Sequence, residues 1–545
     1  MYKSACTQRE IVRVNKIVKI STSLVFVVLL TSPSLIHAGR NLFDNYSMFQ
    51  IPSNSKYLRF KMDPTNDNLR HFIYETGPKV DIEPDGDQRG IVTDPTKINT
   101  TIELQNLYYG SVQFTKDQNG TIIADATQVT QELVYKDVFP YQYNFQVDSQ
   151  GQVHTAFIYN YTLVYGLRDT SGNWHFQNIF NNTYWYSMMP DIALGANELP
   201  RITFAAAYKK LGLQYVHSPL YQNTGLGTSH RSVQYVYASD TGNGLNWTIF
   251  DVTDSQTYNV FTPERFQALN PGIYINDGIV YIGFNGDYPL SVSSRMEMVR
   301  FDEIPTSQTN FTAGRHNWIF ETATRATKFR TPNMVVLGGA FLMIVGTSQS
   351  GGAMAFMLSH ENDAPLPLLA ERKTQWKVVY IENERRNIPI TAIRAFYDPN
   401  TNLYVASYSY YQSLDSSAGT FNNDVFLITI QNLNNEGIGL GYERVTDTNN
   451  QQHHYSAPIV DNEGSLEVFY MEQTATKDWN VVLSKRLPLP PTEGGSEWGF
   501  MLAVLMMAVI TAGSVFGIKH FVPKPKVKEE ILPHMVNLRD EISVD

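Results

Sequence analysis

The chain has 545 residues, 43% of them hydrophobic and 12% aromatic, so it can bury a large core and is not expected to be disordered. Only 17% of the residues are charged, which argues against a coiled coil or a long acidic tail. The net charge is −10, and the stretch between Gly39 and Trp498 is more acidic still because both ends are rich in Lys and Arg. We therefore expect no nucleic-acid partner.

The N-terminal end has the plan of a secretory signal peptide. A basic stretch is followed by the uncharged run Ile20–Leu30 and by small residues that end at Ala38. These features predict a signal peptide over residues 1–38, with cleavage after Ala38. The alternative is a retained signal anchor, but the apolar run has 11 residues and a spanning helix needs about 20.

The C-terminal end predicts a membrane span. Residues 499–518 are 20 residues without a charge, enough to cross about 30 Å of hydrocarbon as a helix. Trp498 marks the interface, and the lysines after the span predict a cytosolic tail at 519–545. Residues 488–498 are a Pro-rich and then Gly-rich linker. Residues 39–487 are therefore predicted to be a lumenal or extracellular domain of a single-pass type I membrane protein.

Asn-x-Ser/Thr sequons support this orientation, because all of them precede the span. The predicted glycosylation sites are Asn45, Asn99, Asn119, Asn160, Asn181, Asn246 and Asn310. The single cysteine, Cys6, lies in the predicted signal peptide. The mature domain is therefore expected to have no disulfide, which a domain of this size can tolerate.

Between the ends, short runs rich in β-branched and aromatic residues alternate with Asp, Asn, Gly and Pro clusters, which predicts an all-β fold. A repeat runs through this region: a Gly or Asn that we call the anchor, followed six residues later by an aromatic. The clear anchors are Asn68, Gly151, Gly278, Asn402 and Gly464, and the looser ones are Glu198 and Gly339. Asp148 and Asp461 precede two anchors, as in hairpins where Asp caps the turn and Gly takes a positive φ.

A second marker falls late in the repeat, where an aromatic begins a final apolar strand. Its members are Trp174, Trp247, Trp318, Trp376 and Tyr442. The anchors are about 66 residues apart on average, long for a propeller blade of about 40–50 residues but compatible with loop insertions. The predicted fold class is thus all-β: a six- or seven-bladed β-propeller ectodomain with one C-terminal transmembrane helix.

The stretch from Asp148 to Ile179 resembles the repeats of sialidase-like β-propellers, the neuraminidase-repeat or Asp-box superfamily, and weaker copies cover most of residues 60–487. The Asp-box is nowhere intact, since it is compressed before Trp174 and stretched before Trp247. The resemblance implies the fold more than an activity. Sialidases of that superfamily use an arginine cluster for the substrate carboxylate, a Tyr nucleophile activated by Glu, and an Asp acid/base. The resemblance would imply the same groups here if the chain were an active sialidase. Arg201 is the nearest counterpart of the arginine motif, and no catalytic Tyr can be selected.

The third residue after the anchor is often polar, although strands of a propeller are packed on both faces and a polar side chain there is costly unless paired. This observation selects the candidate ligand-binding residues His71, His154, Arg201, Tyr281 and Glu467. They could line a central channel or mouth, or they could form hydrogen bonds between blades. We expect no cofactor and no metal, and we interpret His453-His454 as a solvated loop pair.

Three functions remain open from the sequence. The first is a membrane glycoprotein whose propeller binds a protein or glycan partner. The second is a membrane-tethered sialidase-like glycoside hydrolase. The third is a structural surface-coat glycoprotein. For each, the expected location is a membrane of the secretory pathway, with the plasma membrane favoured.

Overall fold

The structure is a computed structural model in which the chain divides into two compact units, residues 1–487 and 488–545. It describes residues 43–486 apart from gaps at 79–103, 118–121, 124–127, 182–184, 209–230, 243, 254–266, 288–293, 315, 322–332, 338–339, 348–351, 360–376, 381–393, 399–402, 416–419, 435–436, 447–452, 462–463, 475 and 477. Within these ranges no helix has the length and hydropathy needed to cross a bilayer. The predicted signal peptide, linker, span and tail lie outside them.

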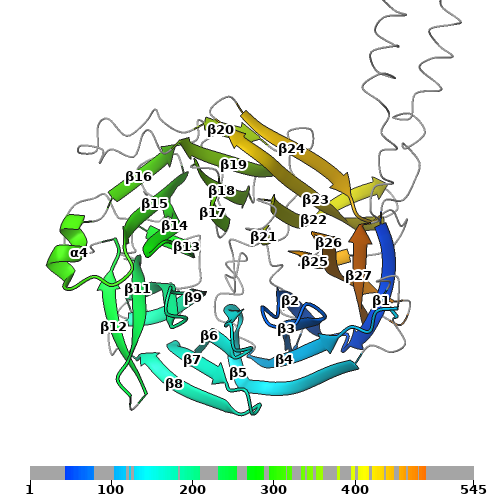
Figure 1. The fold of residues 1–545 in the computed structure, drawn as a ribbon, viewed down its shortest axis with the longest axis horizontal. Helices are drawn as coiled ribbons and strands as arrows, with labels where there is room; N and C mark the ends of the chain where they lie inside the picture. The colour runs from blue at the N-terminus through cyan, green and yellow to red at the C-terminus, as the bar shows by residue number, and fades with distance from the viewer. Residues whose placement is uncertain are drawn as a thin grey trace, which may run out of the picture. The chain divides into compact units, whose positions relative to one another are not determined.

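The described residues are almost entirely antiparallel β-structure (Figure 1). The first sheet follows chain order and contains β2 (Ser55–Met62), β3 (Leu69–Thr76), β4 (Gln105–Gln113), β5 (Gln128–Val147), β6 (Val153–Tyr159), β7 (Thr162–Arg168) and β8 (Trp174–Phe180). The long strand β5 belongs to two halves of this sheet. Its first part, Gln128–Val138, pairs with β4, and its second part, Val138–Val147, pairs with β6.

The second sheet also joins two groups of four strands. Its members are β9 (Trp185–Leu194), β10 (Pro200–Tyr208), β11 (Arg231–Asp240), β12 (Leu245–Asp251), β13 (Gln267–Asn276), β14 (Ile279–Asp287), β15 (Ser294–Asp302) and β16 (His316–Glu321). The groups are linked by one parallel pair, Arg231 with Gln267. The one helix within the described ranges, α4 (Gln308–Gly314), precedes β16.

Three further sheets have four strands each. The third contains β17 (Asn333–Leu337), β18 (Ala340–Thr347), β19 (Gly352–Ser359) and β20 (Lys377–Tyr380). The fourth contains β21 (Arg394–Asp398), β22 (Leu403–Asp415), β23 (Thr420–Asn434) and β24 (Gly437–Arg444). The fifth contains β25 (His453–Val460), β26 (Leu466–Gln473), β27 (Trp479–Arg486) and β1 (Phe43–Ile51). Pairing of β1 with β27 therefore joins the two ends of the described chain.

We call the first strand of each four-strand run the inner strand, and β2, β9, β13, β17, β21 and β25 lie toward the centre in Figure 1. The inner strands are β2, the second half of β5, β9, β13, β17, β21 and β25. Each contacts the next in this order, and β25 contacts β2 again. This closed sequence of contacts is the arrangement of a β-propeller, in which sheets stand face to face around an axis.

The core lies between neighbouring sheets. Phe72 and Phe60 of the first sheet pack with Phe469 of the fifth, and Ile158 of the first sheet packs with Phe204 of the second. Both faces of most strands are therefore covered. This explains why their sequences include short continuous apolar runs such as Val468–Met471, all buried.

The predicted repeat is confirmed by the strand positions. The anchors Asn68, Gly151, Glu198, Gly278 and Gly464 lie one or two residues before the second strand of a four-strand run, namely β3, β6, β10, β14 and β26. The anchors Gly339 and Asn402 lie outside the described residues. Among the described late markers, Trp174, Trp247, Trp318 and Tyr442 lie on fourth strands, while Trp376 is outside the described residues. The turn chemistry also holds at Asp148, whose carboxylate accepts the Gln152 amide hydrogen at 2.7 Å while Gly151 has φ 77°.

Candidate functional site

Two of the candidate residues form the same three-residue arrangement in neighbouring halves of the first sheet. His71 lies 2.8 Å from Asp63 through Nε2 and 2.5 Å from the Tyr109 hydroxyl through Nδ1. His154 lies 3.3 Å from Asp148 through Nε2 and 2.7 Å from the hydroxyl of Tyr165 through Nδ1. With an ionised carboxylate, Nε2 donates and Nδ1 accepts from the tyrosine. Both ring nitrogens of each imidazole therefore have a hydrogen-bond partner nearby in the same sheet or its turns.

Several groups in these arrangements have shifted pKa values, namely Asp63, Tyr109, His154 and Tyr165. Burial alone would raise the pKa of Asp63, but hydrogen bonds from His71 and Thr65 outweigh it and lower that pKa to about 2. Burial lowers the pKa of His154 although Asp148 opposes this. Burial also raises the pKa of Tyr109 and of Tyr165. A catalytic acid or base needs a pKa near the working pH, so these groups suit structure better than proton transfer.

Two other candidates belong to buried ion pairs. Arg201 Nη2 lies 2.6 Å from Glu303 and also donates to Asn197 at 3.0 Å, while Nη1 donates to the Ala238 carbonyl at 3.0 Å. Glu467 lies 2.9 Å from Arg70, which connects the fifth sheet with the first. Burial raises the pKa of Glu467, while Arg70 opposes that change. The Arg70–Glu467 pair thus joins two sheets, and the Arg201–Glu303 pair joins the two groups of strands in the second sheet, while the net contribution of such pairs to stability is small.

Tyr281, the last candidate, lies on β14 and is buried beside Tyr274, with ring centroids 6.1 Å apart. The structure thus distributes the five candidates over several sheets and does not bring them together. Their contacts match the interpretation of hydrogen bonding within and between blades, and ligand binding by them stays a prediction. The physical reason is that alternate side chains of a second strand point toward the two neighbouring sheets: Glu467 faces Arg70 while Tyr470 packs against the fourth sheet.

A different residue stands out on the inner strands. The Arg59 side chain of β2 is 9% exposed, and among the described residues it has no hydrogen bond and no carboxylate within 4.0 Å. Its guanidinium lies 5.4 Å from the ring centroid of Tyr143. Burial lowers the pKa of Arg59, and Tyr143, Asp191 and Glu75 only partly oppose this. A buried cation without an ion pair is costly and calls for a functional explanation.

Arg59 and three residues of the neighbouring inner strands, Tyr143, Asn144 and Asp191, form what we call the inner-strand cluster. Asp191 of β9 accepts a hydrogen bond from the Asn144 amide of β5 and another from the Ile273 backbone at 3.0 Å. The carboxylate is therefore held by β5 and β13, and it acts on Arg59 through its charge without forming an ion pair within 4.0 Å. The cluster offers a guanidinium, whose planar fork of donors fits a carboxylate, sulfate or phosphate group.

Sequence reasoning missed Arg59 because it followed the anchors, and Arg59 precedes the first of them. A usable signal was present, since Arg59 interrupts the apolar run Tyr57-Leu58-Arg59-Phe60. A charge in such a run needs a partner or a ligand. The sequence does not show which of the two it has.

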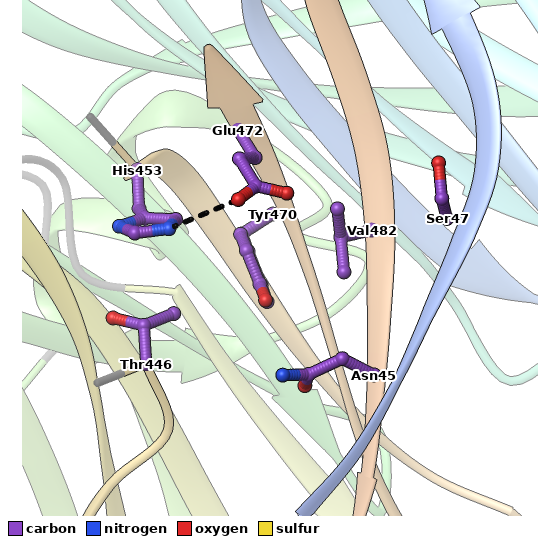
Figure 2. Close-up of a pocket in the computed structure, with 7 residues that line it drawn as sticks. All are labelled: Asn45, Ser47, Thr446, His453, Tyr470, Glu472 and Val482. Atoms are coloured by element: carbon purple, nitrogen blue, oxygen red, sulfur yellow. Dashed lines mark ion pairs between the residues drawn. The ribbon is translucent and has the colours of Figure 1, made fainter. Parts of the chain in front are cut away.

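Figure 2 shows a pocket of about 240 Å³ on the side of the fifth sheet that faces the end of β24. It is lined by Asn45, Ser47, Thr446, His453, Tyr470, Glu472 and Val482. His453 lies 3.8 Å from Glu472 and is 1% exposed. The interpretation of His453 as part of a solvated loop pair is therefore wrong, because this residue begins β25 and the packed sheets cover it.

No protein-family model and no curated protein matches the sequence. Similar solved structures include a Trypanosoma rangeli sialidase, with TM-score 0.35, 10% identity, and coverage of 68% of this chain and 56% of the sialidase. The NanB sialidase from Streptococcus pneumoniae has TM-score 0.35 and 11% identity over 83% of this chain and 72% of its own. The Dos1 propeller has TM-score 0.36 and 11% identity over 82% and 96%. At such TM-scores and identities these similarities carry no argument about fold or activity.

Proposed function

We propose that this protein is a single-pass type I membrane glycoprotein whose lumenal or extracellular propeller binds an acidic glycan through Arg59. The observation that carries the proposal is the buried guanidinium without an ion pair in the inner-strand cluster. One aromatic ring adjoins the guanidinium, because the Tyr143 ring centroid lies 5.4 Å from Arg59. The protein is net acidic, so recognition must come from these local contacts rather than from long-range attraction.

We further propose seven blades of four strands. The support is the seven anchors, the seven inner strands and the closed order of their contacts, with β5 serving two blades and β1 completing the last. The membrane placement is supported by the signal-like start, the uncharged stretch at 499–518 and the sequons before it.

The binding proposal is tested with the full-length protein in detergent against matched panels of neutral, carboxylated and sulfated glycans. We expect binding of acidic members only, weakened by salt. Arg59→Ala should reduce affinity about tenfold or more, because a hydrogen bond to a charged group contributes about 1.5–3 kcal/mol. Arg168→Ala is the matched control, since Arg168 is paired with Glu132 at 2.6 Å. Equal binding by the Arg59 variant, or binding of a protein partner alone, would refute the proposal.

A glycoside hydrolase is the rival function, favoured by the proximity of Asp191 to Arg59. It requires an arginine cluster, yet Arg70 and Arg201 are both held in ion pairs. Hydrolysis of an aryl sialoside by the pure protein, abolished in Arg59→Ala, would favour the enzyme over the binding protein. A structural coat protein would show neither hydrolysis nor glycan binding.

A further inference from the structure

The pocket in Figure 2 contains both ends of a sequon, Asn45 and Ser47, on the edge strand β1. The Asn45 side-chain oxygen accepts a hydrogen bond from the Ser484 hydroxyl, and Ser484 lies 3.3 Å from the Tyr470 hydroxyl. Among the described residues, the Asn45 amide nitrogen has no hydrogen-bond partner. Figure 2 shows this nitrogen directed from β1 toward the side of the pocket where Thr446 lies. The amide is thus oriented with its reactive atom inside the pocket.

The lining of the pocket suits a sugar ring. Glu472 offers a carboxylate that can accept hydrogen bonds from sugar hydroxyls, and Tyr470 and Val482 add apolar surface. The Thr446 hydroxyl already accepts from the Val425 amide at 2.9 Å and donates to Asp424 at 3.1 Å, so it offers the sugar a packing contact only. The volume of about 240 Å³ is below the range of about 300–1,000 Å³ that is usual for drug-sized ligands, so a single small ring is the appropriate size.

We infer that Asn45 carries an N-linked glycan whose first N-acetylglucosamine occupies this pocket. The Asn45 amide nitrogen forms the bond to C1 of the sugar and gives up one proton. The bond between C1 and the pyrophosphate of a lipid-linked oligosaccharide breaks, and the pyrophosphate leaves with the lipid. The inference rests on the proposed lumenal placement of the domain.

A glycan at this position would stabilise the closure of the propeller. Asn45 belongs to β1, which completes the fifth sheet from the opposite end of the chain, while Thr446 follows β24 of the fourth sheet. A sugar that contacts both residues joins the two sheets. Asn310 provides the contrast: it is exposed at α4, and its amide nitrogen already donates to Thr306 at 2.7 Å.

The test uses the full-length protein from a glycosylating host and compares two changes at Ser47. Ser47→Ala destroys the sequon and leaves Asn45 with its Ser484 contact, whereas Ser47→Thr keeps the sequon. Peptide mass mapping should find Asn45 modified in the wild type and in Ser47→Thr but not in Ser47→Ala. The melting temperature of Ser47→Ala should fall by about 2–4 °C, and that of Ser47→Thr should not.

Two further samples separate the first sugar from the rest of the glycan. Trimming the high-mannose protein with an endoglycosidase that leaves one N-acetylglucosamine should not lower the melting temperature, and Asn310→Gln should not lower it either. An unmodified Asn45 beside glycans at other sequons would overturn the inference, as would equal melting of Ser47→Ala and Ser47→Thr. Absence of glycans from every sequon would instead overturn the lumenal placement on which the inference rests.

Discussion

Arg201 and Arg59 are both buried arginines in this propeller, one on a second strand and one on an inner strand. Arg201 is 0% exposed, and its nitrogens contact Glu303, Asn197 and the Ala238 carbonyl. Arg59 is 9% exposed and has no such contact among the described residues. Desolvation costs both side chains, but only Arg201 is compensated within the fold. The contrast separates a charge that fixes the fold from a charge that is available to a ligand.

The sharpest way to break this comparison is to remove the compensated arginine. Arg201→Met should lower the free energy of unfolding by about 3–5 kcal/mol, because Glu303 would remain buried without its partner. Urea denaturation of the purified protein measures the change, with exposed Lys136→Met as a control expected to stay within about 0.5 kcal/mol of the wild type. A loss below about 1 kcal/mol in Arg201→Met would mean that the pair does not hold the fold.

Two histidines sharpen the comparison, because they have the same Asp-x-x-Gly-x-x-His spacing in different surroundings. His154 is buried between Asp148 and Tyr165, while the His175 side chain is 62% exposed beside Asp169. His154→Ala should cost about 1–3 kcal/mol because it leaves buried polar partners unsatisfied. His175→Ala should cost no more than about 0.5 kcal/mol. Equal losses in chemical denaturation would show that the motif matters for its turn and not for its burial.

The sequence predicted the local parts of these units well. Asp148 and Gly151 lie three residues apart, so turn chemistry alone indicates their hydrogen bond and positive φ. Long-range partners could not be predicted in this way. Arg70 and Glu467 are 397 residues apart, and only closure of the propeller brings them together. The lack of an ion pair at Arg59 could not be predicted either. A sequence shows a charge in an apolar run but not whether another sheet supplies a carboxylate beside it.

A smaller loss of stability is expected when the pH is lowered and Asp63 becomes protonated. The pKa of Asp63 in the folded protein is about 2, below its ordinary value of 3.8, so its contribution to stability is complete above about pH 4 and is lost as the pH falls through 2. The expected contribution is about 1–2 kcal/mol. Wild-type protein should therefore lose more stability between pH 5 and pH 2 than Asp63→Asn does in the same denaturation series. If the wild type and Asp63→Asn lost the same unfolding free energy between pH 5 and pH 2, the hydrogen bond between His71 and Asp63 would not stabilise the fold.

The most direct measurement is the free energy of unfolding of Arg59→Met, determined beside Arg201→Met. We predict a value within about 1 kcal/mol of the wild type, or above it, because the substitution removes a buried charge that the fold does not compensate. The same variant should lose binding to acidic glycans. A loss of about 3–5 kcal/mol, equal to that of Arg201→Met, would show that Arg59 serves the fold and would contradict its assignment to a ligand.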